Sequence, residues 1–175
     1  MYFRLHPPAS LNVYRALADG LLRDGSLSID GHLTTQFEPL YPMCLAAARL
    51  VVREPILVDL LQIAVAAFGA VLLSRLPLTL TGDSRAAVAA AVLYAIDPLL
   101  VREAVGHSES ALFTTLLIAF ANAVVSAETL VAFAVAGAWL GLAILTRTAA
   151  LPLLLLMPAW LAIRIARLFA QARSR

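Results

Sequence analysis

The chain has 175 residues, of which 62% are hydrophobic and 14% are charged, and its formal net charge is +2. Soluble domains contain roughly 45–50% apolar and about 25% charged residues, and a short chain leaves much of its surface exposed. The composition argues against a soluble enzyme, a disordered tail and a nucleic-acid-binding domain. It predicts an all-α integral membrane protein.

The first 39 residues are the least hydrophobic part of the chain and lack the apolar stretch of a signal peptide. Within them, apolar residues of segment 12–23 recur at helical spacing and predict an amphipathic helix. Asp24-Gly25 and Asp30-Gly31 are turn signals. We therefore expect residues 1–39 to form an extracytoplasmic loop that carries a surface helix.

Residues 40–54 are apolar but too short to cross a bilayer, which needs about 20 apolar residues, so we expect a short interfacial helix there. Residues 55–165 are expected to form a bundle of about five transmembrane helices, and residues 166–175 a basic cytoplasmic tail. The predicted spans are 55–74, 86–100 (interrupted by Asp97-Pro98), 110–127, 130–146 and 149–165.

The positive-inside rule places the C-terminus in the cytoplasm, because that orientation gives the cytoplasmic side the excess of arginine. We expect a prokaryotic cytoplasmic (inner) membrane. Residues 1–39 then lie outside, together with the connections around Glu109 and Arg147. Since no helix precedes residues 1–39 to carry them across, we also expect that a preceding transmembrane helix is absent from this chain.

Several small or polar residues are most simply explained by helix packing. Asp59 and Gln62, continued by Ala66 and Gly69, form a stripe on the first predicted span. Gly137 and Gly141 form a GxxxG pair on the fourth. The single cysteine, Cys44, rules out an internal disulfide and is expected to be a small packing residue.

Two connections on the outer side contain candidate functional residues. In the predicted loop 97–110, Glu109 stands at the start of a span. A carboxylate at this position is either stabilised by the helix dipole, which is a structural role, or binds a metal or a basic partner. His107 in the same loop is expected to be solvated. Arg147 lies between two apolar spans without a nearby acid in sequence. It either reaches lipid headgroups or binds a phosphate, which its planar guanidinium grips through two hydrogen bonds.

Four segments resemble the membrane glycosyltransferases of the GT-C superfamily, in particular the protein O-mannosyltransferase and aminoarabinose-transferase branches. Residues 14–31 and Glu38-Pro-Leu-Tyr-Pro42 are similar to the first outer loop of that family, which typically ends in Pro-Pro-Leu-Tyr-Pro. Ser108–Phe113 is similar to its acidic residue followed by Ala-Leu-Phe. Gly141–Ala149 is similar to its Gly-Leu-Ala…Thr-Arg-Pro segment. These matches occur in family order over nearly the whole chain.

The resemblance implies inverting transfer of a sugar from a polyprenyl-phosphate donor to a lipid, glycan or protein acceptor on the non-cytoplasmic face. It implies Glu109 as a catalytic acidic residue, Arg147 as a donor-phosphate contact, and Tyr14, Tyr41 and His107 as an acceptor or loop site. Some members use a divalent metal ion, so a divalent metal is a possible cofactor whose ligands the sequence leaves unknown. The family's general base precedes the loop tyrosine, whereas Ser10, Leu11 and Asn12 of this chain provide no carboxylate.

We therefore expect a truncated or divergent glycosyltransferase whose other partners are membrane lipids. The missing carboxylate keeps a second hypothesis open, a non-catalytic homologue or a membrane packing or lipid-binding subunit. A small transporter is a third, although we find neither repeated halves nor broken helices other than that at Asp97-Pro98.

Overall fold

The computed structural model describes residues 9–29, 32–52, 55–105, 108–158, 160 and 162. The protein is mostly helical (83%) and belongs to the all-α class. In chain order the elements are α1 (Ala9–Asp24), β1 (Ser28–Ile29), β2 (His32–Leu33), α2 (Leu40–Val51), α3 (Pro55–Thr81), α4 (Ser84–Ile96), α5 (Pro98–Val105), α6 (Ser110–Ser126), α7 (Leu130–Thr146) and the 3₁₀ turn η1 (Thr148–Ala150).

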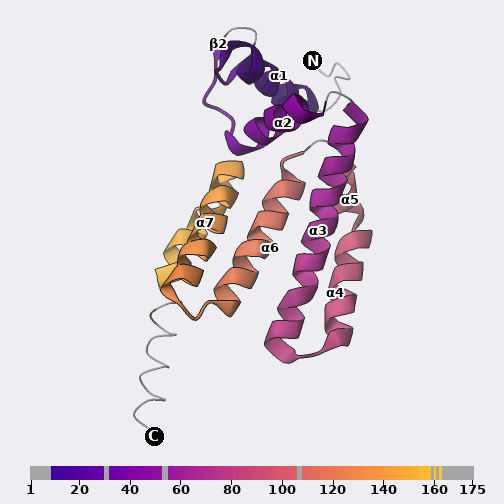
Figure 1. Ribbon diagram of the computed structural model, residues 1–175, viewed down its shortest axis with the longest axis vertical. Coiled ribbons are helices and arrows are strands. Elements are labelled where there is room, and N and C mark those ends of the chain that lie inside the picture. Colours follow the sequence, from indigo (N-terminus) through magenta and orange to yellow (C-terminus); the bar gives the residue numbers. More distant parts are fainter. Residues whose placement is uncertain are drawn as a thin grey trace, which may run out of the picture.

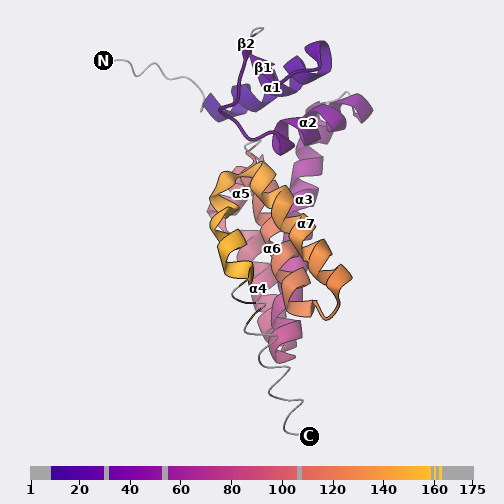
Figure 2. The ribbon, with the colours of Figure 1, turned by 90° about the vertical axis from the view of Figure 1, so that its left-hand side faces the viewer.

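The elements form two layers, a bundle and a cap. In the bundle, α3 packs against α4 on one side and α6 on the other, and α7 packs against α6 (Figure 1). The cap, residues 9–52, lies across one end of the bundle and consists of α1, α2 and the two-stranded antiparallel β1–β2 hairpin (Figure 2). The amphipathic helix predicted over residues 12–23 is present as α1, and it buries Tyr14, Leu17 and Ala18.

Local chemistry explains where most of the helices begin and end. The Asp83 carboxylate accepts a hydrogen bond from the Arg85 N–H (2.8 Å) and the Thr129 hydroxyl one from the Ala132 N–H (3.2 Å), which caps α4 and α7. Gly25 and Gly82 follow α1 and α3 with φ of +67° and +72°, a conformation that glycine adopts without strain.

The interruption predicted at Asp97-Pro98 is confirmed. The Asp97 carboxylate accepts from the Leu99 and Leu100 N–H groups (2.8 and 3.1 Å) and so caps α5, and Pro98 is the first residue of that helix. Helices α4 and α5 therefore meet at a bend of 55°. The predicted polar loop 97–110 is wrong in part, because α5 includes Arg102 and places it on a helix.

The predicted end of the first span at Ser74 is also wrong, since α3 continues through Arg75 and Pro77 to Thr81. The Thr81 hydroxyl donates to the Pro77 carbonyl (2.9 Å), a local bond that helical backbone provides for threonine. A charged residue is not sufficient to end a helix, and α3 ends only where Gly82 turns the chain.

Polar groups join α3 to α6. The Thr115 hydroxyl donates to the Val65 carbonyl (3.1 Å), and the Asn122 amide donates to the Leu72 carbonyl (2.9 Å). A Cβ atom at Gly69 would lie 2.7 Å from the Thr115 hydroxyl. The prediction that Gly69 belongs to a packing stripe is therefore confirmed.

Two other packing predictions are wrong. A Cβ atom at Gly137 or Gly141 would have no neighbour within 4 Å among the described residues. Helix α7 instead turns Leu140 and Ala143 toward α6, and both are buried there. Cys44 is exposed rather than packed.

Length and composition make one helix, Ile56–Thr81, long and apolar enough to cross a membrane, and the bent pair α4–α5 a second if it is taken as one span. The other apolar helices of the described chain are shorter, at 10–17 residues: α2, α6, α7 and Thr148–Pro158. The helices predicted over residues 110–127 and 130–146 are present as α6 and α7 with nearly the expected bounds. The last residues of the fifth predicted span lie outside the described residues.

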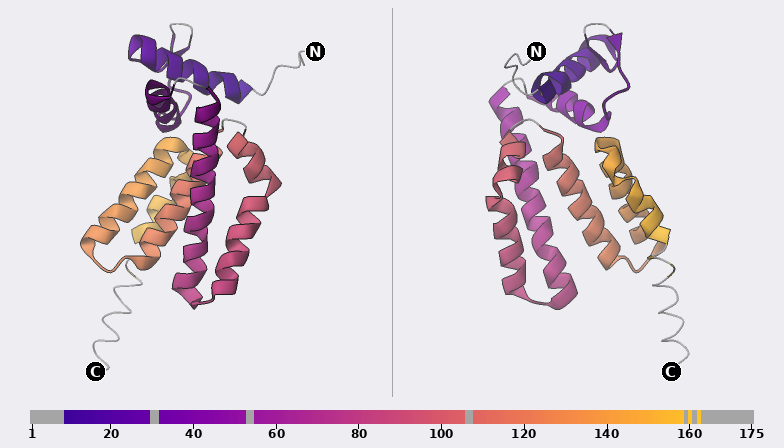
Figure 3. Two further views of the ribbon diagram at one scale, coloured as in Figure 1. Left: turned by 45° about the vertical axis from the view of Figure 1, so that its right-hand side comes forward. Right: turned by 180° about the vertical axis from the view of Figure 1, so that it is seen from behind.

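Successive long helices run in alternating directions, which determines what lies at each end. The cap, the end of α5, the start of α6 and the turn after α7 lie at one end of the bundle, and the α3–α4 and α6–α7 connections at the other (Figures 1 and 3). Glu109 and Arg147 are thus brought to the end that carries the cap.

Candidate functional site

An aromatic group holds the elements of the cap together. The Tyr14 ring on α1 meets Phe37 and Tyr41 edge-to-face, with centroid distances of 5.8 and 5.0 Å. Tyr14 and Tyr41 are 6% and 4% exposed. Such pairs are worth about 0.5–1.5 kcal/mol beyond their buried area. They hold the two phenol groups in fixed positions at the junction between cap and bundle.

Glu109 lies beneath Tyr14. It precedes α6, yet its side chain makes no capping hydrogen bond to that helix. Instead, the Tyr14 hydroxyl donates to the Glu109 carboxylate. Burial, and then the charge and hydrogen bond of Glu109, raise the pKa of Tyr14 well above its usual value, so Tyr14 remains a hydrogen-bond donor.

Glu38 connects the cap to the turn after α7. Its Oε1 atom accepts hydrogen bonds from both the backbone N–H and the hydroxyl of Thr148, each 3.1 Å long. Burial by itself would raise the pKa of Glu38. The hydrogen bonds from Thr148 and from its own N–H, together with the charge of nearby Arg147, outweigh burial and lower that pKa.

Arg147 is exposed and ends α7 in an extended conformation. Its guanidinium carbon lies 5.9 Å from the centroid of the Phe113 ring on α6, within the range of a cation–π contact. Its charge acts on Tyr14 and Glu38. Arg147 has no acidic residue near it in the sequence, but the fold brings Glu38 close to it.

Tyr41 extends the group toward α3. Its hydroxyl accepts a hydrogen bond from the Gln62 amide. Burial is the main reason that the pKa of Tyr41 is raised, and Glu109 adds to the rise. The Oε1 atom of Gln62 is buried and has no hydrogen-bond partner within the described part of the chain. Tyr41 and Gln62 also border a narrow apolar pocket of about 70 Å³ between α2, α3 and α6.

We call Tyr14, Glu38, Tyr41, Glu109 and Arg147 the junction cluster. Four of these were singled out in the sequence as candidate site residues, and the fold brings all four together. The fifth sequence candidate, His107, lies outside the described residues. The sequence contained one signal for the missed residue, since Glu38 stands where the glycosyltransferase-like motif has its first proline.

A divalent metal stays a prediction. Among the residues described, no three His, Cys, Asp or Glu side chains are grouped closely enough to hold a metal ion. The junction cluster contributes two carboxylates, fewer than the ligands of a closed protein site.

The arrangement brings two carboxyl groups, one guanidinium group and two phenol groups to a common junction. Comparison of the chain with models of protein families, with curated proteins and with solved structures finds no match.

Proposed function

We propose that the chain is a membrane glycosyltransferase of GT-C type that moves a sugar from a polyprenyl phosphate to an acceptor hydroxyl. The observation that carries this proposal is the junction cluster. Its residues come from α1, the 37–39 loop, α2, the start of α6 and the turn after α7, and the Glu109 side chain contacts Tyr14 instead of capping α6.

A membrane setting is supported by the lengths of the helices and by the surface they expose. At about 1.5 Å per residue, the 27 residues of α3 extend for about 40 Å and exceed the hydrocarbon core of about 30 Å. The 17 residues of α6 and of α7 are at the short limit of the spanning range, about 17–25. Only 17% of the apolar window of α3 is buried inside the protein. Lipid is a favourable environment for such a surface.

In the proposed reaction, the Glu109 carboxylate accepts the proton of the acceptor hydroxyl as that oxygen attacks the anomeric carbon of the sugar. The bond between this carbon and the phosphate oxygen breaks, and the polyprenyl phosphate leaves with the bonding electron pair. Arg147 binds the negative charge that develops on the phosphate. Configuration at the anomeric carbon inverts, because the acceptor attacks opposite the leaving group.

Glu38 has a different role in this scheme. Its lowered pKa makes it a weak proton acceptor, and its bonds to Thr148 fix the backbone next to Arg147. We assign it as a positioning residue that holds the guanidinium against the cap. Tyr14 and Tyr41 lie on the cap side of the cluster, where the Tyr14 hydroxyl donates to Glu109.

Turnover of polyprenyl-phosphate sugars by membranes that contain the protein tests the proposal. We expect Glu109→Ala and Arg147→Ala each to reduce the rate by at least about 100-fold, the typical contribution of a general base or of a charge-stabilising group. Glu128→Ala and Arg85→Ala are the matched controls, because both side chains are exposed at the opposite end of the bundle. Equal rates in all four variants would refute the assignment of the site.

Sidedness is tested separately, in a Cys44→Ala background. Thr35→Cys places a thiol in the cap and Asp83→Cys one in the α3–α4 connection, and both positions are exposed. In intact cells an impermeant maleimide should label position 35, whereas position 83 should require permeabilised membranes. The reverse pattern would place the junction cluster on the cytoplasmic face and contradict the proposed orientation.

The lack of a carboxylate before Tyr14 favours a second candidate, a homologue that binds lipid without catalysis. Introducing Asp at Ser10 or at Asn12 distinguishes the two. A gain in transfer would support the catalytic proposal. Unchanged, absent transfer in every variant would favour the binding subunit.

A further inference from the structure

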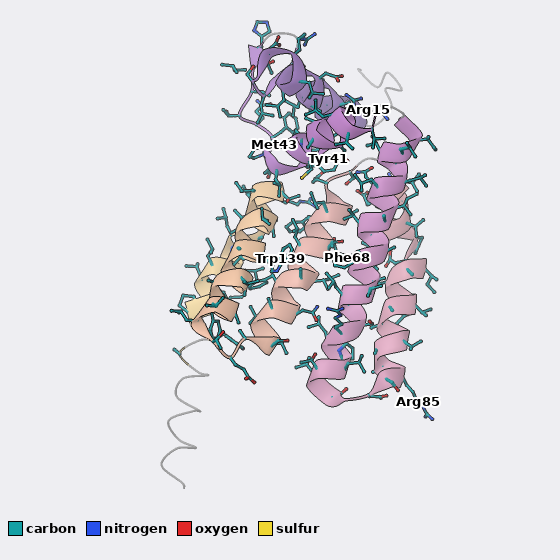
Figure 4. The ribbon with its side chains drawn as sticks, in the orientation of Figure 1. Arg15, Tyr41, Met43, Phe68, Arg85 and Trp139 are labelled. Carbon is teal, nitrogen blue, oxygen red and sulfur yellow. The ribbon has the colours of Figure 1, made fainter. Side chains whose placement is uncertain are left out.

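A second cavity lies between α1, α2 and the first turns of α3. Its volume is about 360 Å³, and Arg15, Asp19 and Arg49 line it together with Leu22, Leu45 and Val58. Figure 4 shows Arg15 at the place where α1 approaches the beginning of α3. None of the residues of the junction cluster lines this cavity.

The charged side of the cavity suits an anion. Two arginines and one aspartate line the cavity, and Arg49 forms a salt bridge with Asp19. The Asp19 side chain is 58% exposed, whereas that of Arg49 is 27% exposed, so an incoming anion can compete with Asp19 for Arg49. Guanidinium groups bind phosphate oxygens through paired, charge-assisted hydrogen bonds.

The other side of the cavity is apolar and leads onto a lipid-like surface. Val58 belongs to α3, where Leu61, three residues further on and on the same side of the helix, is 50% exposed. An acyl chain that starts at the cavity would lie along this face of α3. A soluble phosphate would leave the apolar side unused, so the lining favours an amphiphile over a free anion.

We propose that this cavity binds the phosphate headgroup of an anionic phospholipid from the surrounding membrane, with Arg15 and Arg49 as its ligands. The site rests on the membrane setting proposed above but not on sugar transfer. Leu45 and Val58 also border the apolar pocket beside Tyr41. A bound lipid would therefore stabilise the wall against which one phenol of the junction cluster packs.

The full chain in phosphatidylcholine nanodiscs, with and without phosphatidylglycerol, provides the test. Native mass spectrometry measures the phosphatidylglycerol that stays bound to the released protein. We expect Arg15→Ala combined with Arg49→Ala to weaken retention by about tenfold or more, since one charged hydrogen bond of about 1.5 kcal/mol corresponds to about tenfold. Arg75→Ala combined with Arg85→Ala is the charge-matched control and should retain the lipid.

Asp19→Asn guards against a loss that merely reflects misfolding. It removes the anion that competes for Arg49, so phosphatidylglycerol retention should increase. Unchanged retention in Asp19→Asn, or equal losses in the two arginine pairs, would overturn the site. If glycerol phosphate displaces the lipid at equal concentration, the apolar side is not used and the site binds a free phosphate, which overturns the lipid proposal.

Failure of this proposal can be distinguished from failure of the membrane setting. A chain that leaves the membrane pellet after an alkaline carbonate wash contradicts the setting itself. A chain that stays in the pellet but shows no selective phosphatidylglycerol retention contradicts only the lipid site.

Discussion

Replacing Glu38 by alanine removes an acceptor that joins two segments 110 residues apart. Two hydrogen bonds, each 3.1 Å long, are lost from the N–H and the hydroxyl of Thr148. The net value of one such bond is about 0.5–1.5 kcal/mol. Because Glu38 is only partly buried, we take the lower half of this range and expect a total loss of about 1–2 kcal/mol.

Thermal unfolding in mild detergent, followed by circular dichroism at neutral pH, measures this loss. One kcal/mol corresponds to about 2–4 °C for a chain of this size, so the midpoint should fall by about 2–8 °C. Gln36→Ala changes an exposed side chain of the same loop and should leave the midpoint almost unchanged. Thr148→Ala removes only the hydroxyl bond and should cost about half as much as Glu38→Ala.

The double variant isolates the contact, because coupled residues give less than additive losses. The pH dependence follows from the lowered pKa of Glu38. A depressed folded-state pKa contributes stability above the unfolded value, about 4.3, and this contribution is lost as the pH falls through the folded value. The stability difference between the wild type and Glu38→Gln should therefore shrink as the pH falls below about 4.3 and vanish once the pH lies below the folded-state pKa of Glu38. Additive losses, or a difference that persists in acid, would refute the reasoning.

Three further results are expected. Asn122→Ala removes the bond to the Leu72 carbonyl and should destabilise the α3–α6 contact by about 0.6–1.7 kcal/mol in the same unfolding assay, whereas Ser126→Ala, exposed at the end of α6, should not. Gly20→Ala would place a Cβ atom 2.4 Å from the Ser28 carbonyl oxygen and should lower the free energy of unfolding by about 1–3 kcal/mol. Gly137→Ala has open space and should raise it by up to about 1 kcal/mol through helix propensity. Equal effects of the two substitutions would contradict this packing. The raised pKa of Tyr14 contributes stability that is present below about pH 10 and is lost at higher pH, so Tyr14→Phe should show a smaller alkaline loss. An unchanged alkaline profile would contradict the raised pKa, which burial and then the Glu109 contact produce.

The sequence by itself determines much of the secondary structure. Apolar runs predict α6 and α7 nearly as they occur, and Asp97-Pro98 predicts the break between α4 and α5, because hydrophobic periodicity and capping depend on residues a few positions apart. The alternation of helices across the bundle also follows from the chain order. It is sufficient to bring Glu109 and Arg147 to the end that carries Tyr14.

Only the tertiary structure decided which of these residues meet. Glu38 was overlooked as a site residue, since its partner Thr148 is 110 positions away and no local pattern links an acidic loop residue to a turn that distant. The GxxxG pair failed as a packing signal for a related reason. Small residues permit close approach, but the rotation of α7 about its axis is set by how Leu140 and Ala143 fit against α6. Contacts of this kind depend on how whole helices pack against one another, and no local sequence pattern predicts that packing.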